Sequence, residues 1–128
     1  MDKGFKNIAV WFFQILAGVI LLMTSWMKLS GQPGEVELFT ALGMEPTGRY
    51  LIGVIEGMAA IFLFTKRLSA TGGILALGTM LGALIAHLSI LGFTGDNALL
   101  WSTVMVSSLI VTIARRRNLP LIGSTFEE

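Results

Sequence analysis

The chain has 128 residues, of which 54% are hydrophobic and 13% are charged, and its formal net charge is +1. Water-soluble domains contain about 25% charged residues. A domain of this size also has a large surface for its volume, so the composition argues against a water-soluble protein. The absence of cysteine excludes disulfides, thiolate metal sites and intrinsic dithiol chemistry. The length predicts a single domain over residues 1–128.

Four long apolar segments are predicted to cross a membrane as helices. A hydrocarbon core about 30 Å thick requires about 20 helical residues. Three runs of this order contain no Asp, Glu, Lys or Arg, and a fourth is interrupted only by Glu56. The predicted spans are residues 8–27, 50–65, 68–93 and 98–114. The first is longer than a signal-peptide core, so it is expected to be a retained span. The predicted fold class is an all-α membrane protein, a four-transmembrane-helix bundle.

The distribution of basic residues predicts the orientation of this bundle. Cytoplasmic ends of membrane helices are enriched in Lys and Arg. If the N-terminus is inside, seven basic residues are cytoplasmic and two are external. The seven are Lys3, Lys6, Lys66, Arg67, Arg115, Arg116 and Arg117, and the two are Lys28 and Arg49. Both termini are therefore predicted to be cytoplasmic, and the run 115–117 is interpreted as a membrane-surface anchor. Nucleic acid is not an expected partner.

The connections between the predicted spans differ in length. An outer loop covers residues 28–49, and within it residues 35–42 have the spacing of a short amphipathic helix that would lie in the membrane interface. An irregular loop with an incidental helical turn fits the same residues equally well. Residues 66–67 and 94–97 are predicted to form tight turns, and Asp96 is expected to cap the fourth helix.

Two ionisable residues lie at membrane depth, Glu56 in the second predicted span and His87 in the third. Such groups are costly in lipid and normally face the bundle interior with a partner. Each lies six residues from the outer end of its span, which corresponds to about 9 Å of depth. Because the two helices are antiparallel, Glu56 and His87 are predicted to lie at one depth, as a proton-handling pair or as a pair that only holds the two helices together.

Small residues flank both ionisable side chains. Gly53, Gly57 and Ala60 border Glu56, and a stripe on the third span leads to His87, at the spacing that lets membrane helices approach closely. The stripe consists of Gly72, Ala76, Thr79, Ala83 and His87.

The predicted result is an outer-leaflet polar pocket. Its predicted members are Lys28, Arg49, Glu56, His87 and Asp96. Lys28 and Arg49 also fit a second interpretation, in which they extend to lipid headgroups, and this one is favoured for Arg49. Gln14, near the inner end of the first helix, is interpreted as an interhelical hydrogen-bonding residue.

The chemistry available to this pocket is acid–base chemistry. A carboxylate and an imidazole, with Lys28 tuning them, could exchange protons with a quinone headgroup or with a carried solute. One His and one or two carboxylates make a poor metal ligand set. Haem held by two His of one chain is excluded, since the chain contains one His. No phosphate-binding loop, dinucleotide fingerprint or nucleophile–base motif is present.

The order of motifs resembles the DoxX and DoxX-like family of small four-helix membrane proteins. The matching segments are Trp26-Met27-Lys28-Leu29-Ser30-Gly31 with Pro33, Arg49-Tyr50 through Gly53 to Glu56, and Gly78 to Leu88. The resemblance implies a four-helix membrane bundle, with Lys28, Gly31, Glu56 and His87 at family positions. Some relatives are subunits associated with thiosulfate:quinone oxidoreduction, and others associate with oxidant-defence or sulfur-handling proteins.

Three functions are compatible with these features. The first is a membrane subunit of a redox-linked system in the bacterial cytoplasmic membrane, with a quinone or other lipophilic ligand and a soluble redox partner protein. The second is a non-catalytic assembly or scaffold protein. The third is a small proton-coupled transporter. It fits less well because the acid within the membrane, Glu56, lies in the second span and because the basic residues are strongly biased toward one side of the membrane. A homo-oligomer is compatible with all three.

Overall fold

The structure is a computed structural model that describes residues 3–88 and 95–119, and all secondary structure within these ranges is helical. The α-helices are α1 (Lys3–Leu29), α2 (Pro33–Ala41), α3 (Thr47–Leu63), α4 (Ser69–Ala86) and α5 (Gly95–Ala114). Two short 3₁₀ helices are η1 (Lys66–Leu68) and η3 (Arg116–Asn118).

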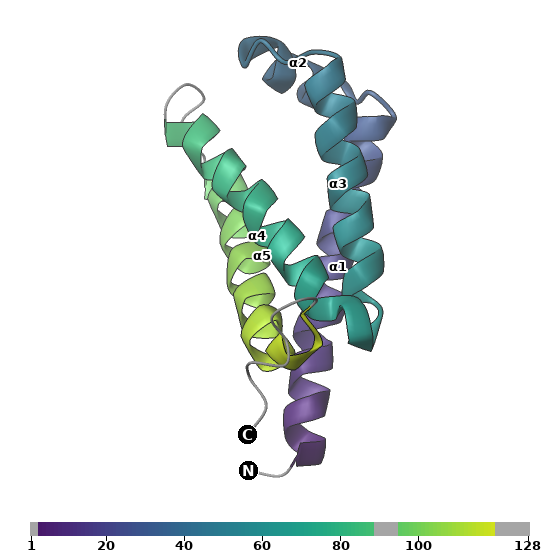
Figure 1. The fold of residues 1–128 in the computed structure, drawn as a ribbon. Coiled ribbons are helices and arrows are strands. Elements are labelled where there is room, and N and C mark those ends of the chain that lie inside the picture. Colours follow the sequence, from purple (N-terminus) through teal and green to yellow (C-terminus); the bar gives the residue numbers. More distant parts are fainter. Residues whose placement is uncertain (1–2, 89–94, 120–128) are drawn as a thin grey trace.

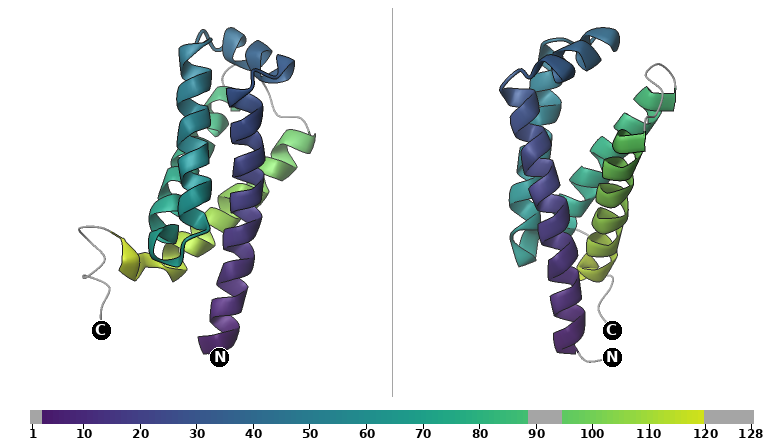
Figure 2. Two further views of the ribbon diagram at one scale, coloured as in Figure 1. Left: turned by 90° about the vertical axis from the view of Figure 1, so that its right-hand side faces the viewer. Right: turned by 180° about the vertical axis from the view of Figure 1, so that it is seen from behind.

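The four long helices form two antiparallel pairs. Helix α1 lies beside α3, and α4 lies beside α5 (Figures 1 and 2). The pairs pack together at the end of the molecule that contains η1, and they diverge toward the end that contains α2 (Figure 1). These are called the η1 end and the α2 end below. Helix α1 begins and α5 ends at the η1 end, while α2 lies across the far ends of α1 and α3 (Figure 2).

Glycines explain where the two pairs meet. A Cβ on Gly72 would lie 2.9 Å from the backbone of Ala59 and Leu63 on α3, and one on Gly73 would lie 2.2 Å from Thr112 Oγ1 on α5. The first turns of α4 therefore touch both neighbours directly. At Gly78, on another face of α4, a Cβ would meet nothing within 4 Å.

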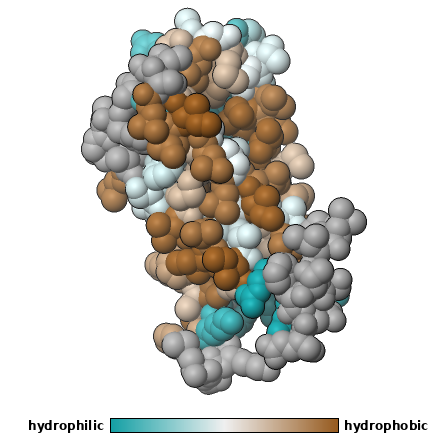
Figure 3. Space-filling model, turned by 60° about the vertical axis from the view of Figure 1, so that its left-hand side comes forward, coloured by the Kyte–Doolittle hydropathy of each residue, from teal (hydrophilic) through white to brown (hydrophobic). Residues whose placement is uncertain are grey.

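The core is apolar, but polar residues are also buried in it, and large apolar side chains lie at the surface. Large apolar side chains on the long helices are exposed, such as Phe12 at 60%, Ile61 at 60% and Ile85 at 67%. Buried polar residues include Gln14, Ser25, Arg49, Glu56, Ser69, Ser107 and Ser108. In Figure 3 hydrophobic residues cover the middle of the visible face, and hydrophilic residues gather toward the two ends. Water-soluble proteins rarely expose apolar patches this continuous.

Two described helices are long and apolar enough to cross a membrane. They are Gly4–Leu29, with 26 residues, and Lys66–Ala86, with 21 residues, a segment that includes η1. Leu99–Ala114 is a shorter apolar helix.

Helix boundaries differ from the predicted spans mainly at the connections. Residues 33–41 form a helix where the sequence left helix and loop open; Pro33 opens it, a position that proline favours, and Gly43 follows it with a φ of 70°. Helix α5 begins at Gly95, inside the predicted turn 94–97. Residues 89–93, the end of the third predicted span, lie outside the described residues, as do Thr94 and the side chain of Asp96.

Candidate functional site: an ion-pair cluster at the α2 end

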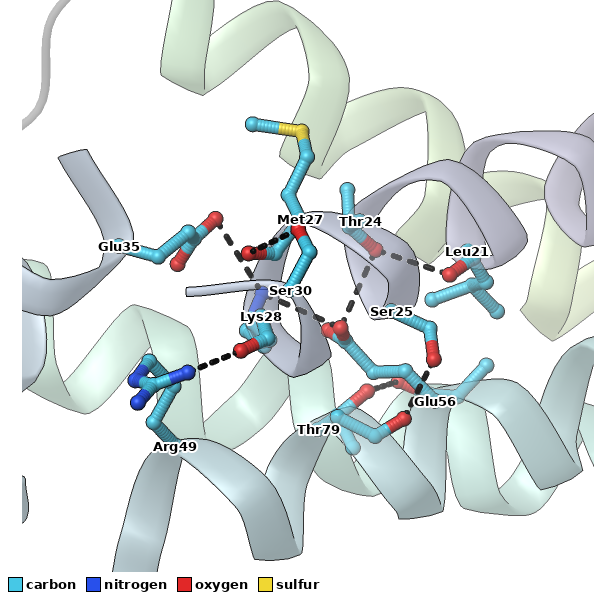
Figure 4. A network of polar contacts seen from close by, with 12 residues as sticks. Leu21, Thr24, Ser25, Met27, Lys28, Ser30, Glu35, Arg49, Glu56 and Thr79 are labelled. Atoms are coloured by element: carbon cyan, nitrogen blue, oxygen red, sulfur yellow. Dashed lines mark hydrogen bonds and ion pairs between the residues drawn. The ribbon is translucent and has the colours of Figure 1, made fainter. Parts of the chain in front are cut away.

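The candidate site is centred on Lys28, in the last turn of α1. Its Nζ lies 3.1 Å from Glu56 Oε1 of α3 and 3.6 Å from Glu35 Oε1 of α2. The three side chains are 11%, 5% and 13% exposed in the order Lys28, Glu56, Glu35. One cation thus joins three helices, and Figure 4 shows the two carboxylates converging on it from α2 and α3. We call Lys28, Glu35 and Glu56 the ion-pair cluster.

Hydroxyl groups of α1 complete the surroundings of Glu56. Thr24 Oγ1 lies 3.1 Å from Glu56 Oε1 and 3.1 Å from the carbonyl oxygen of Leu21, so its single proton serves one acceptor at a time (Figure 4). Ser25 Oγ donates to the Gly53 carbonyl at 2.6 Å. Thr24, Ser25 and Lys28 lie on one face of α1, because residues three and four apart are neighbours on a helix.

The small residues predicted to border Glu56 pack against α1. A Cβ on Gly53 would lie 3.0 Å from a Leu29 methyl group, and one on Gly57 would lie 3.0 Å from Ser25 Oγ. Their lack of side chains allows α3 to approach α1 closely enough for the Glu56–Lys28 contact.

Arg49 lies at the same end of the molecule. It is buried, whereas the sequence favoured an exposed side chain that extends to lipid headgroups. It is only 5% exposed, its Nε donates to both Glu45 oxygens at 2.9 Å, and its Nη1 donates to the Lys28 carbonyl. Its guanidinium carbon lies 4.4 Å from the centre of the Tyr50 ring. The headgroup interpretation of Arg49 fails because Glu45 supplies a carboxylate within the chain.

His87 has a different environment from Glu56. Its Nδ1 lies 2.7 Å from the Ala83 carbonyl, in the last turn of α4, and α4 diverges from α3 toward this end (Figure 1). The polar partners of the Glu56 carboxylate among the described residues are Thr24 and Lys28. No hydrogen bond or ion pair joins Glu56 to His87 in residues 3–88 and 95–119. Proton handling by these two residues stays a prediction.

The structure therefore joins Lys28, Arg49 and Glu56 of the predicted pocket, and it adds residues that the sequence did not single out. Glu35 and Glu45 are the added acids. Glu45 could have been found, since it precedes Arg49 by four residues at helical spacing. Glu35 could not have been found in this way, because its contact with Lys28 depends on how the loop between α1 and α2 places α2.

This end has more carboxyl groups than basic groups in contact with them. Lys28 faces two carboxylates, and Arg49 is paired with its own acid, Glu45. Glu35 Oε2 is buried and has no hydrogen-bond partner among the described residues. This oxygen can therefore accept a hydrogen bond. No group of three or more His, Cys, Asp or Glu that could hold a metal occurs in the described part of the chain.

A second polar cluster lies at the η1 end. Gln14 is fully buried; its Nε2 donates to the Leu63 carbonyl at 2.9 Å, and its Oε1 accepts from Arg115 Nε at 3.0 Å. Arg115 Nη2 also donates to Asn7 Oδ1 at 2.9 Å, and burial lowers the pKa of this guanidinium. Gln14 therefore links α1, α3 and the end of α5, as expected of an interhelical hydrogen-bonding residue.

Comparison with known proteins gives one distant relative. No family model matches the chain, and no solved structure matches it. The chain is 26% identical over 85 residues to a Bacillus subtilis (strain 168) protein named "Putative oxidoreductase CatD". The match covers 66% of this chain and 63% of the length of that protein. The chain is thus distantly similar to a protein whose name describes an oxidoreductase.

Proposed function

We propose that this chain is an integral membrane protein in which α1, α3, α4 and α5 each cross the bilayer. The exposed apolar side chains of these helices and their buried polar residues support this proposal. Helix α3, the shortest of the four with 17 residues, is about 25 Å long, which approaches the thickness of a hydrocarbon core.

The proposed orientation places the η1 end in the cytoplasm. Among described side chains this end carries six basic residues, and the α2 end carries two that are already paired with acids. The six are Lys6, Lys66, Arg67, Arg115, Arg116 and Arg117. The excess of positive charge on the cytoplasmic side of membrane proteins supports the assignment. In a bacterium the membrane would be the cytoplasmic membrane, and the ion-pair cluster would lie near its outer face.

The proposed activity is that of a DoxX-like membrane subunit in a redox-linked system, which binds the headgroup of a quinone or a similar lipophile. The observation that carries it is Lys28 held between Glu35 and Glu56 at one end of an apolar helix assembly. A lipophile reaches this depth through the bilayer, and its polar headgroup finds charged hydrogen-bonding groups there. The name of the distant relative supports a redox-linked role. The redox cofactor would belong to a soluble partner protein.

The test is to purify the protein in a mild detergent, extract it with organic solvent and identify co-purifying lipophiles by mass spectrometry. Glu56→Gln and Lys28→Met should lose a ligand that the unchanged protein retains. Glu37→Gln is the matched control, because Glu37 is an exposed acid on α2, and it should retain the ligand. Loss from all three variants, or from none, would contradict a headgroup site at the cluster.

A purely structural role is the competing function, and one observation favours it. Lys28 and Glu56 already satisfy each other within the chain, and buried ion pairs can serve to fix helix register. An assembly protein of this kind would purify without a lipophile, and its Glu56→Gln variant would fold but melt at lower temperature. That result would replace the redox proposal.

A further inference from the structure

One oxygen of the ion-pair cluster lacks a donor. Glu35 Oε1 faces Lys28, whereas Glu35 Oε2 is buried with no hydrogen-bond partner in the part of the chain that the structure describes. A buried acceptor that has given up water without gaining a donor destabilises the folded state. Glu35 Oε2 is therefore the atom at which a ligand that donates a hydrogen bond gains most.

The local charges favour the same kind of ligand. Lys28 carries one positive charge, and Glu35 and Glu56 carry two negative charges when ionised. Arg49 adds no free positive charge, because Glu45 binds it through two oxygens. A ligand group that only accepts hydrogen bonds would face the unpaired carboxylate oxygen and be repelled. A hydroxyl group can donate to that oxygen and also accept from a neighbouring ammonium.

Lys28 is able to supply that second contact. An ammonium group has three N–H donors; one faces Glu56 Oε1 at 3.1 Å, and Glu35 Oε1 lies farther away, at the 3.6 Å of an ion pair. The Glu35 side chain is 13% exposed, and Oε2 itself is covered. The terminal torsion of a glutamate is soft, so turning Oε2 toward an incoming group has little torsional cost.

We propose that the site binds its lipophile in the reduced, hydroxyl-bearing form, a hydroquinone, in preference to the oxidised quinone. This inference rests on the proposed function, since it concerns the ligand of that same site. The hydroquinone O–H donates to Glu35 Oε2, and the hydroxyl oxygen accepts from Lys28. The quinone carbonyl can only accept, so it leaves Glu35 Oε2 without a donor.

The test is a binding titration of the full-length protein in detergent, under anaerobic conditions, with duroquinone and with durohydroquinone. The unchanged protein should bind the hydroquinone at least about tenfold more tightly, the lower end of the effect of one hydrogen bond to a charged group. Glu35→Gln should bring the affinity ratio close to one, because a neutral amide both donates and accepts. Glu37→Gln should leave the ratio unchanged.

Each other outcome overturns a defined part of the proposal. Equal or tighter binding of the quinone by the unchanged protein overturns the preference and leaves the headgroup site standing. A preference that persists in Glu35→Gln removes Glu35 from the explanation. Binding of neither form overturns the headgroup site and the preference together. If Glu35→Gln does not fold, Glu35→Asp serves in its place, since its shorter side chain withdraws the carboxylate and should also reduce the ratio.

Discussion

Lys28 is the residue on which the α2 end depends. Its ammonium group contacts both Glu35 of α2 and Glu56 of α3. Its backbone carbonyl also accepts a hydrogen bond from Arg49. Removing one member of a buried ion pair destabilises a protein more than replacing the whole pair, because an uncompensated charge remains. For Lys28 two carboxyl groups, those of Glu35 and Glu56, would lose their basic partner.

Lys28→Met should lower the free energy of unfolding by about 3 kcal/mol, the typical cost of breaking a buried pair from one side. The melting of helical circular dichroism in detergent measures this effect. The double variant Lys28→Met with Glu56→Leu should be more stable than Lys28→Met alone, since it removes one of the stranded carboxylates.

Lys66→Met is the control for this prediction, because Lys66 is exposed at the opposite end of the molecule. It should melt close to the unchanged protein. Equal melting of the Lys28 and Lys66 variants would show that the ion pairs contribute nothing measurable to stability.

At the residue scale, the sequence predicts Lys28, Arg49 and Glu56 as charged residues of the site, but it predicts only part of their pairing. Depth along a span follows from counting residues, and Glu56 and Lys28 both had to lie near one end of the helices. Which neighbour Glu56 contacts depends on how each helix is rotated and tilted. The divergence of α4 from α3 leaves α1, with Thr24 and Lys28, as the polar neighbour of Glu56.

At the scale of the elements, the first turns of α4 determine how the two helix pairs join. Gly72 and Gly73 are adjacent, so they lie on different sides of α4, and each lies so close to a different helix that an added Cβ would clash with it. The sequence shows both glycines, but only their contacts distinguish them from Gly78, which has open space around it.

Gly72→Ala should therefore destabilise the protein, by about 1–3 kcal/mol, as expected for overpacking against atoms that cannot move. Gly78→Ala should be neutral or stabilising, by up to about 1 kcal/mol, because alanine has the higher helix propensity. Melting curves of the two variants under one set of detergent conditions make the comparison. Equal effects at both positions would contradict the close packing of α4 on α3.

Helix α2 shows what local sequence can specify and where it stops. Pro33 at the start and Gly43 after the end are ordinary boundary signals, and they agree with the helix Pro33–Ala41. Nothing in the spacing of residues 33–41 reveals that Glu35 contacts Lys28. That contact depends on α2 folding back across the ends of α1 and α3 (Figure 1).

At the scale of the whole molecule, the exposed apolar surface and the uneven charge predict how the chain sits in a membrane. The chain has no cysteine, so single cysteines can be introduced without background. Glu37→Cys and Arg67→Cys place thiols at exposed positions on the α2 end and the η1 end.

In intact cells a membrane-impermeant maleimide should label Glu37→Cys, and it should label Arg67→Cys only after the membrane is permeabilised. Carbonate extraction should leave both variants in the membrane fraction. Labelling of Arg67→Cys alone in intact cells would reverse the orientation, and release of the protein by carbonate would contradict the transmembrane assignment.

Three properties of the chain can be predicted from its residues alone: its helical character, the places where apolar segments break, and the uneven distribution of basic residues between the two ends. These properties are local: they depend on composition, on residue counting along a helix and on boundary residues. The tertiary structure decided which side chains meet. Lys28 bridges Glu35 and Glu56, Arg49 turns inward to Glu45, and His87 bonds to its own helix. The physical reason is that helix rotation, tilt and divergence depend on contacts between distant segments, such as Gly72 against α3, which no local pattern specifies.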